Sequence, residues 1–366
     1  MDNSQKKIIR IIYFTEAGGV LAERIRSFYG DRGFDVTASS GKGKGIYKAW
    51  TEENFQTDKA LIFIGACGIA VRAIAPFVRS KKTDPAVIVC DEKGNYIIPI
   101  LSGHIGEANA YAREIASFTG GQAVLTTATD VNHLLAVDVF ATENGMHISD
   151  MLQAKDFSSA LLQERKARFF LPRAYRGDIL FGEGQPEEIE IIECESRDPA
   201  GFGEGNSEKL LFGSESRATD CLISPEIPSG QCLQLIPSCL LVGIGCRRGK
   251  GKEELSSFLK EVLDKERLSL YGLSEICSVD VKKDEAGLIA LSRELGLPFR
   301  TFSAESLREV KGEFTASTFV KSQIGVDNVC ERSVMAAGAK RLLVSKQAKN
   351  GMTIAVGIKE TVLKWQ

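Results

Sequence analysis

A histidine between glycines is the strongest candidate for chemistry in this sequence. The loop after one apolar segment contains Ser102, Gly103, His104, Gly106 and Glu107. Its glycines let the backbone approach a ligand closely, and a neutral imidazole can take a proton from water near neutral pH. We therefore predict that His104 is catalytic and that Ser102 or Glu107 orients it or the water. Gly103 and Gly106 are predicted ligand contacts. The alternative is a structural imidazole that caps a turn.

A second glycine-rich loop follows an earlier apolar segment. Gly65 and Gly68 bracket the exit of that segment, and Arg72 comes one helical turn later. Backbone amides at the start of a helix can bind an anion, and a guanidinium nearby can pair with it. We predict that these three residues contact a ligand, although glycine at such a turn is often needed only for backbone geometry.

A third glycine-rich loop carries paired arginines. It contains Gly243, Gly245, Cys246, Arg247 and Arg248. The run is similar to a dinucleotide-binding fingerprint, but its third glycine comes one residue too late. No acidic residue ends a second strand about 20 residues further on, as ribose binding requires. The pattern excludes an NAD site and leaves an anion-binding loop.

Polar side chains also gather after the apolar segment at residues 122–125. Thr127, Thr129 and Asp130 follow it directly. Ligands of open α/β sheets collect at the carboxyl ends of strands, so these three residues are predicted ligand contacts. The alternative is an N-cap cluster, because threonine and aspartate are favoured before a helix.

Several other reactive side chains have an ordinary explanation. Cys67 and Cys246 lie in glycine-rich loops without a neighbouring histidine and acid, so packing explains them better than a nucleophilic role. His147 is expected in a solvated turn. Lys282 and Glu285 lie at a charged junction that is typical of a solvated helix start.

Composition excludes several function classes. The 366 residues include 46 basic and 48 acidic ones, so a net charge of −2 gives no global basis for binding nucleic acid or an anionic membrane. The apolar runs are too short to span a bilayer, and no signal-peptide core precedes the first apolar segment. We expect a cytoplasmic protein.

The cysteines give no sign of a metal site. Nine cysteines occur without a C-x-x-C pair, and there are three histidines. This spacing favours reduced, mostly buried thiols over disulfides or zinc. We expect neither a protein-bound metal nor a cofactor.

The elements that position these residues indicate a multi-domain α/β protein. Short apolar segments alternate with amphipathic stretches in the N-terminal third and again after Cys239. Between them lie charged and loop-rich stretches. We predict an N-terminal α/β domain (1–145), a small middle module (146–237) and a C-terminal α/β domain (238–366). Strands are expected at 7–14, 60–64, 87–90, 96–101, 122–125, 189–194, 240–245, 276–281 and 298–302, helices at 71–78 and 106–118, and a hairpin from 342–344 and 353–356.

Several of these motifs, in this order, resemble the CbiG family of cobalamin biosynthesis. The N-terminal resemblance covers about the first 145 residues and is carried by the stretches 65–76, 84–87, 101–109 and 126–130. Residues 243–249, with Lys282 and Glu285, resemble the C-terminal domain of the family, and the resemblance implies that Lys282 and Glu285 contact the substrate with this loop. The sequence departs from the family pattern at Glu107, where a small residue such as glycine is expected, and at His133, where glycine is usual.

The resemblance implies a cobalt-precorrin-5A hydrolase. Such an enzyme opens the ring A δ-lactone of a cobalt tetrapyrrole and releases a two-carbon fragment at C20 as acetaldehyde. The cobalt belongs to the substrate, so no cofactor of the protein is implied. Arg72, Arg247 and Arg248 could pair with the carboxylates of this substrate, because guanidinium matches a carboxylate in a bidentate fork. His104 is then a general base, an axial cobalt ligand or a carboxylate contact.

Three other interpretations stay open. A tetrapyrrole-binding protein could deliver an intermediate to another enzyme without catalysis, and contact with neighbouring pathway enzymes would be transient. A tetrapyrrole methyltransferase would need S-adenosylmethionine, for which the sequence offers no adenosine pocket. A simple esterase lacks support, because no G-x-S-x-G motif is present.

Overall fold

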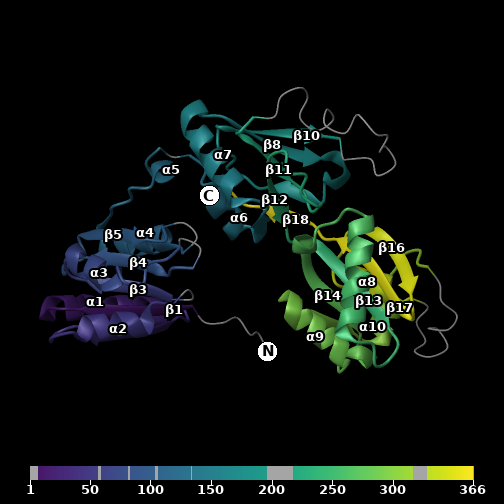
Figure 1. Ribbon diagram of the computed structural model, residues 1–366, viewed down its shortest axis with the longest axis horizontal. Helices are drawn as coiled ribbons and strands as arrows, with labels where there is room; N and C mark the ends of the chain where they lie inside the picture. The colour runs from purple at the N-terminus through teal and green to yellow at the C-terminus, as the bar shows by residue number, and fades with distance from the viewer. Residues whose placement is uncertain are drawn as a thin grey trace. The chain divides into compact units, whose positions relative to one another are not determined.

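The computed structural model describes residues 7–56, 59–80, 83–103, 106–132, 134–195, 217–315 and 328–365. The chain divides into two compact units, Met1–Val139 and Phe140–Gln366, and each is described by itself (Figure 1). Mixed sheets covered by helices confirm the predicted multi-domain α/β class. The predicted boundaries near residues 145 and 237 stay predictions.

Unit 1 is built on a six-stranded sheet with the order β2-β1-β3-β4-β5-β6. The first four strands in this order are parallel, β5 is antiparallel to β4, and β6 is parallel to β5. The strands are β1 (Ile8–Tyr13), β2 (Asp35–Ser40), β3 (Lys59–Ile64), β4 (Ala86–Cys90), β5 (Tyr96–Leu101) and β6 (Gln122–Ala123).

Helices cover both faces of this sheet. One apolar cluster joins the sheet to α1 and α4, and a second joins its other face to α2 and α3. The connection from β1 to β2 runs toward one end of the strand order, and the connection from β2 to β3 runs toward the other. Because both are right-handed crossovers between parallel strands, their helices α1 and α2 lie on opposite faces of the sheet. The helices are α1 (Glu16–Gly30), α2 (Ile46–Asn54), α3 (Cys67–Ile74), α4 (Ala108–Thr119) and α5 (Ala128–Val131).

The sequence predicted most, but not all, of unit 1. The strand at 7–14 and the pair at 87–90 and 96–101 are confirmed. The strand at 122–125 is wrong in extent, because β6 has only two residues and Gln122 is exposed. β2 was missed because its polar sequence forms a half-exposed sheet edge without an apolar run.

The direction of β5 separates the predicted loops. β3 and β4 end at one edge of the sheet, and β5, which is antiparallel to β4, ends at the opposite edge. Lys7, directly before β1, pairs with Glu107 after β5. Thr15, directly after β1, donates to Glu92 in the β4–β5 turn. Gly65 and Glu107 therefore lie at opposite edges.

The first sheet of unit 2 has the order β10-β8-β11-β12-β7. Only β7 is antiparallel to its neighbour. We expected charged and loop-rich stretches in this region, and its described residues form a five-stranded sheet. The elements of this part of the chain are β7 (Met146–Ile148), α7 (Met151–Glu164), β8 (Ala167–Pro172), η1 (Arg173–Tyr175), β9 (Ile179–Phe181), β10 (Ile189–Cys194), β11 (Asp220–Ile223) and β12 (Leu233–Pro237), preceded by α6 (Val137–Glu143), which contains the unit boundary. β9 lies outside the five-stranded sheet and belongs to a separate two-stranded one.

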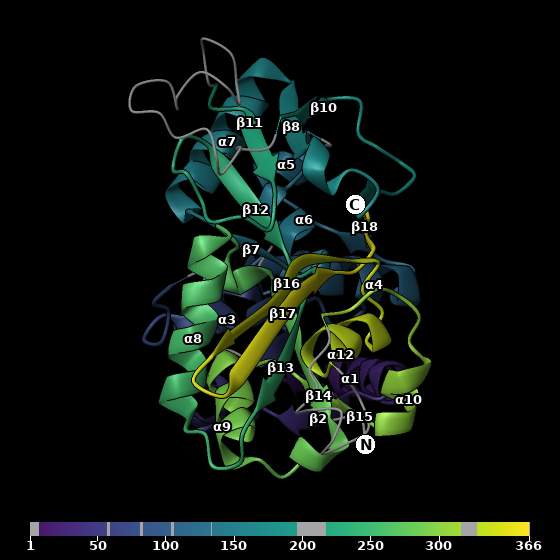
Figure 2. The same ribbon diagram turned by 90° about the vertical axis from the view of Figure 1, so that its right-hand side faces the viewer.

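The second sheet of unit 2 has the order β15-β14-β13-β17-β16. β13, β14 and β15 are parallel, and the predicted terminal hairpin is confirmed as β16 and β17. Figure 2 shows α8 and α12 on either side of β13 and β17. The elements are β13 (Leu240–Cys246), α8 (Lys252–Lys265), η2 (Leu270–Gly272), β14 (Leu273–Val279), η3 (Asp280–Lys282), α9 (Ala286–Leu295), β15 (Phe299–Phe302), α10 (Ala304–Glu309), α12 (Cys330–Ala336), β16 (Arg341–Lys349) and β17 (Met352–Ile358).

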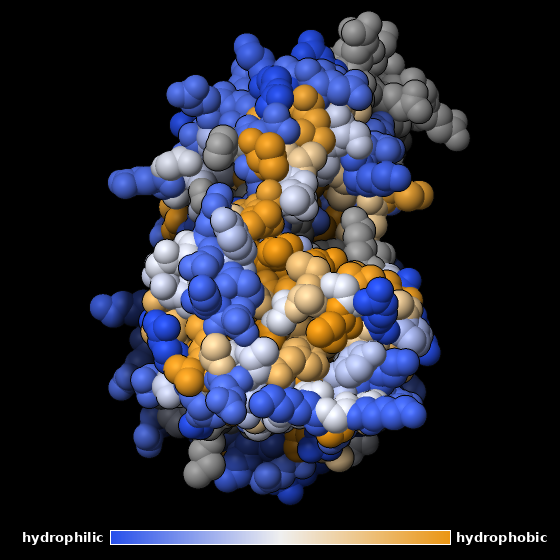
Figure 3. Space-filling view, turned by 90° about the vertical axis from the view of Figure 1, so that its left-hand side faces the viewer, coloured by the Kyte–Doolittle hydropathy of each residue, from blue (hydrophilic) through white to orange (hydrophobic). Residues whose placement is uncertain are grey.

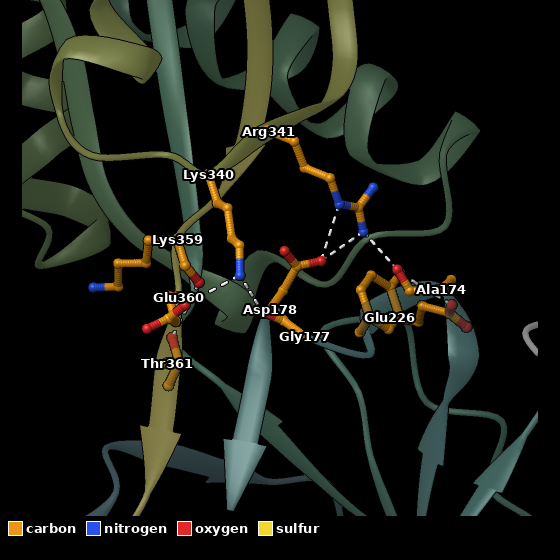
Figure 4. A network of polar contacts seen from close by, with 10 residues as sticks. Ala174, Gly177, Asp178, Glu226, Lys340, Arg341, Lys359, Glu360 and Thr361 are labelled. Atoms are coloured by element: carbon orange, nitrogen blue, oxygen red, sulfur yellow. Dashed lines mark hydrogen bonds and ion pairs between the residues drawn. The ribbon is translucent and has the colours of Figure 1, made fainter.

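A C-terminal strap, residues 359–365, joins these two sheets. Its strand β18 (Thr361–Leu363) pairs with β9, and Trp365 stacks on Phe140 and Phe181. Beside it, the guanidinium of Arg341 donates two bonds of 3.0 and 2.7 Å to the carboxylate of Asp178 (Figure 4). The strap and the Arg341–Asp178 pair thus connect the second sheet of unit 2 with the segment around β9.

The described part of the chain contains no helix that is long and apolar enough to cross a membrane. In the space-filling view of Figure 3, hydrophobic as well as hydrophilic side chains reach the surface. Large exposed apolar side chains of unit 1 include Val20, Val71 and Val131. Exposed apolar residues are ordinary on protein surfaces and imply no partner by themselves.

Candidate functional site

Backbone strain marks both ends of the loop after β5. Ser102 has a φ of 54° and Glu107 a φ of 65°, in the left-handed region that non-glycine residues seldom adopt. Such strain costs on the order of 1 kcal/mol and concentrates at functional sites. It also explains why glycine is expected at position 107. His104, the predicted base, lies outside the described residues, and so does His133.

Ser102 fastens the start of this loop to the start of β4. Its Oγ donates a 2.9 Å hydrogen bond to the carbonyl oxygen of Asp84. Gly106 lies against Ser102, since a Cβ at position 106 would be 2.5 Å from the Ser102 Cβ and 2.9 Å from its carbonyl oxygen. Gly106 is therefore needed for the loop to close on itself.

Glu107 lies in a charged and partly exposed environment. Its Oε2 is 2.6 Å from the Lys7 Nζ, and both side chains are about half exposed. The neighbouring Tyr111 has a raised pKa because it is buried and because the Glu107 carboxylate opposes a second negative charge. Glu107 thus places a carboxylate where the loop ends and α4 begins. Its predicted role in orienting His104 or the water stays a prediction.

The buried amide of Asn109 joins this loop to the run after β6. The backbone N–H of Asn109 donates to the Gly103 carbonyl at 3.0 Å. Its side-chain Nδ2 donates to the Thr127 Oγ1 at 3.1 Å and to Asp130 Oδ2 at 2.8 Å. The other carboxylate oxygen of Asp130 pairs with Arg113. The structure therefore brings two of the sequence-predicted loops together.

This arrangement refines the predicted ligand contacts. Thr127 and Asp130 accept hydrogen bonds inside this network, and the predicted ligand contacts of Thr127, Thr129 and Asp130 stay predictions. Sequence reasoning gave Asn109 no role, although it follows the loop by two residues. The missed signal is a polar residue in the otherwise apolar stripe of α4, where it is only 4% exposed.

The loop after β3 has a packing explanation. A Cβ at Gly65 would lie 2.8 Å from the Phe14 ring, and one at Gly41 would lie 2.4 Å from the same ring. Arg72 turns back, and its Nη1 donates to the Gly68 carbonyl at 3.2 Å. Phe14 thus occupies the space over the carboxyl ends of β1 and β3, and the predicted anion contact of this loop stays a prediction.

The glycines of β13 allow close backbone packing. A Cβ at Gly243 would lie 1.9 Å from the Cys330 carbonyl oxygen, so α12 can approach the sheet only at a glycine. At Gly245 a Cβ would lie 2.6 Å from the Thr353 Oγ1. These two positions are explained by packing inside unit 2.

Lys282 and Glu285 form a buried ion pair beside the loop after β13. Their Nζ and Oε2 atoms are 2.9 Å apart, and the side chains are 10% and 11% exposed. The prediction of a solvated helix start is therefore wrong. Burial opposes ionisation of Glu285, but hydrogen bonds from Lys282 and from the Gly249 N–H hold its pKa below the usual value. The structure brings both residues to the predicted arginine loop.

The exposed members of this loop are arginines. Arg247 and Arg248 are exposed, and the Arg247 N–H donates to the Gly351 carbonyl at 2.9 Å. Burial raises the pKa of the Cys246 thiol, although Lys282 opposes this effect. A raised pKa disfavours the thiolate that a nucleophile needs, which supports packing for Cys246.

Two further features bear on what unit 1 can bind. A groove of about 970 Å³ runs along α1 and carries three acidic and three basic side chains, so it has no net preference for an anion. The groove residues are Tyr13, Thr15, Glu16, Gly19, Val20, Glu23, Arg24, Ser27, Phe28, Asp31, Arg32, Ser40, Lys42 and Phe118.

Within the described residues, no group of three or more histidine, cysteine or acidic side chains could hold a metal ion.

Two family models match the chain. The model described as cobalamin synthesis G N-terminal matches residues 49–130, and the model described as cobalamin synthesis G C-terminus matches residues 240–357. The first match covers both loops joined by Asn109. The second covers the arginine loop and the Lys282–Glu285 pair.

Curated relatives match over most of their length. The cobalt-precorrin-5A hydrolase of Salmonella typhimurium is 34% identical over 98% of this chain and 99% of its own. The cobalt-precorrin-5A hydrolase of Priestia megaterium is 28% identical over 83% of this chain and 79% of its own. A crystal structure of a putative cobalamin biosynthesis protein G homolog from Sulfolobus solfataricus is 22% identical, covers 97% of this chain and 98% of its own, and has a TM-score of 0.36.

Proposed function

Because the chain belongs to the CbiG family of cobalamin biosynthesis, we propose that it is a cobalt-precorrin-5A hydrolase. The observation that carries this proposal is the 34% identity to a hydrolase of that name over almost the full length of both chains. The strained loop after β5 supports it, because backbone strain concentrates at functional sites and this loop lies within one of the matched domains.

The proposed reaction has two steps. A water oxygen adds to the carbonyl carbon of the ring A δ-lactone, and the ester C–O bond then breaks to leave a carboxylate and a hydroxyl on the C20 fragment. That hydroxyl loses its proton and becomes the aldehyde C=O as the C–C bond to the macrocycle breaks. The bonding electrons pass to the macrocycle, which takes up a proton, and acetaldehyde leaves.

We assign the first proton transfer to His104. The residues around it in the sequence hold the loop in place: Ser102 is bonded to Asp84, Gly106 packs on Ser102, and the Asn109 N–H donates to the Gly103 carbonyl. The Ser102 hydroxyl donates a hydrogen bond to the backbone carbonyl oxygen of Asp84, and its own oxygen can accept a hydrogen bond from water. A positioned general base typically contributes about 10²–10⁴ in rate.

Carboxylate recognition is the proposed role of the exposed arginines. Arg247 and Arg248 project from the carboxyl end of β13, and Lys282 is paired with Glu285 beside them. Guanidinium groups suit the acetate and propionate side chains of a tetrapyrrole. We propose that cobalt enters with the substrate and that the protein uses no other cofactor.

The cytoplasm is the proposed location of the enzyme. All nine cysteines are free, and seven of them are buried. Unpaired thiols in this number are typical of proteins in a reducing compartment.

The test is an anaerobic assay with cobalt-precorrin-5A as substrate. The purified protein alone should open the lactone, which adds the mass of one water, and should release acetaldehyde. His104→Ala should reduce lactone opening about 10²–10⁴-fold while still binding the substrate. Near-normal turnover by this variant would remove His104 from the mechanism.

The same assay separates the main alternative. A non-catalytic delivery protein would bind the substrate but release no product without a second enzyme. Binding without any change in substrate mass would therefore reject the hydrolase proposal and favour delivery. Arg247→Ala should weaken binding with a marked dependence on salt, because a charge–charge contact is screened.

A further inference from the structure

Glu285 is a largely buried carboxylate that is bonded to the backbone of the arginine loop after β13 (residues 246–250). It is the N-cap residue of α9, and its side chain is 11% exposed. Its Oε1 accepts a 2.7 Å hydrogen bond from the Gly249 N–H, and its Oε2 accepts one of 2.9 Å from the Lys282 Nζ. Burying a charge is costly unless such partners satisfy it. Glu285 therefore fixes the loop at the residue directly after Arg248.

The turn between β16 and β17 holds the other side of the same loop. The Arg247 N–H donates to the Gly351 carbonyl at 2.9 Å. Gly351 has a left-handed φ of 74°, and a Cβ there would lie 2.8 Å from the Arg247 Cδ, so the arginine stem packs directly on this glycine. The backbone is thus bonded at the residues before and after Arg248.

The start of α9 also packs closely on the arginine loop. A Cβ on Gly287 would lie 2.1 Å from the Lys250 carbonyl oxygen, so the helix can come this close only at a glycine. The loop after β13, the start of α9 and the β16–β17 turn are distant from one another in the sequence. Their contacts hold the two exposed arginines on a fixed backbone.

The charges around Glu285 allow its two conceivable roles to be told apart. Burial opposes its ionisation, but hydrogen bonds from Lys282 and the Gly249 N–H and the charges of Lys282 and Arg248 lower its pKa. If Glu285 acted only through its charge, its removal would make the loop more positive and would strengthen the binding of an anion. If Glu285 holds the backbone, its removal weakens that binding.

From these contacts we infer that Glu285 is a positioning residue, which holds the arginine loop so that Arg247 and Arg248 are preorganised for the carboxylates of the substrate. The inference rests on the proposed function, in which these arginines bind a tetrapyrrole. Glu285 acts through the loop and not by contact with the substrate, because its carboxylate repels those of the substrate. A bidentate guanidinium–carboxylate pair needs aligned partners, and a loop that is already ordered loses less freedom on binding.

The test measures the binding of a fluorescent porphyrin octacarboxylate to the full-length protein, which requires no turnover. Glu285→Ala should raise the Kd about 10-fold, the loss expected when two long side chains must be ordered on binding. Glu285→Gln keeps an acceptor for the Gly249 N–H and should raise the Kd less. Tighter binding by both variants would show a role of the charge alone and would overturn the inference.

Asp220→Ala is the matched control in the same unit. The buried Asp220 carboxylate also accepts bonds from one cationic side chain and one backbone N–H, those of Arg168 and Arg217, all at 2.8 Å. Both alanine variants should lower the melting temperature of unit 2, because each leaves a cation without its partner. Only Glu285→Ala should weaken porphyrin binding; an equal increase in Kd for Asp220→Ala would reduce the effect to a general loss of stability.

Two double variants keep the test informative if Glu285→Ala folds poorly. Glu285→Met/Lys282→Met and Glu285→Gln/Lys282→Met both remove the buried ion pair at nearly constant volume, which proteins often tolerate. They have the same charge and differ in whether position 285 can accept the Gly249 N–H. The first should bind the porphyrin about 10-fold more weakly than the second.

The outcomes separate this inference from the proposed function. Wild-type protein that opens no lactone contradicts the proposed function, whatever the Kd values are. Equal Kd values for the two double variants, or a wild-type protein that does not bind the porphyrin, contradict the inference. In the assay with cobalt-precorrin-5A, Glu285→Ala should raise KM about 10-fold and leave kcat nearly unchanged, because the arginines bind the substrate and do not react with it.

Discussion

The two units each contain a dense polar network, and the two networks differ in what they hold. In unit 1 the network around Asn109 joins two short loops, one of which has left-handed backbone at both ends. In unit 2 the network around Asp178 joins the turn before β9 to the start of β16 through Arg341 and Lys340 (Figure 4). The first network connects two loops, and the second connects a turn to a strand of the second sheet.

The difference shows how a functional network can be told from a structural one. Around Asp178 the ion pair accompanies ordinary strand pairing and aromatic stacking, which stabilise the fold directly. The loop after β5 instead keeps unfavourable backbone angles at Ser102 and Glu107. Strain persists only where the surrounding structure enforces it, so the unit 1 network is the one expected to affect activity.

The largest expected effect is on the strained loop. Gly106→Ala should reduce kcat about 10²-fold, because a Cβ there collides with Ser102 and the loop cannot close. The control is Gly120→Ala in the same unit, where a left-handed φ of 75° is strained but no atom lies within 4 Å. Kinetics that are equal for the two variants would contradict a catalytic role for this loop.

Removal of the aromatic anchor of the strap should affect stability and not chemistry. Trp365→Ala should lower the free energy of unfolding of unit 2 by about 2 kcal/mol, less than for a fully buried aromatic residue, because Trp365 is half-buried. The remaining tryptophan, Trp50, lies in unit 1 and reports its unfolding by fluorescence, while circular dichroism follows both units. A shift in the Trp50 transition would show that the units do not unfold separately.

The ion pair beside the strap should contribute less. Arg341→Met leaves Asp178, which is 3% exposed, without its guanidinium and should cost unit 2 about 1 kcal/mol, since the 44% exposed arginine is partly screened. Lys349, on the same strand as Arg341, makes an exposed pair with Glu261 of α8, and Lys349→Met should cost less than about 0.5 kcal/mol. Equal losses in urea unfolding would contradict a special role for the Asp178 pair.

The smallest effect concerns His147, which is not in the solvated turn that the sequence suggested. It lies in β7 and stacks on Tyr271 with ring centroids 3.6 Å apart, and burial lowers its pKa. Since the folded state binds this proton less readily than the unfolded state, unit 2 should lose stability as the pH falls through 6.5. His147→Phe keeps a stacked ring and should have a flatter pH profile between pH 7.5 and 5.5. An unchanged profile would exclude His147 as its source.

The sequence by itself determined the α/β class and most of the buried strands, because apolar period and glycine position are local properties. It also identified the loop at 102–107 and the run at 127–130 as separate candidates. It missed β2, a polar edge strand, and overestimated β6. Both errors come from strands whose pairing is decided by neighbours and not by their own apolar pattern.

Tertiary structure alone decided which of the candidate loops meet. Gly65 and Gly103 look alike in the sequence, but the reversal of β5 puts them at opposite edges of one sheet. Phe14 fills the space beside Gly65, whereas the Asn109 amide fills the space beside Gly103. A glycine in the sequence shows only that the position has no side chain. Which group packs against that position depends on other parts of the chain.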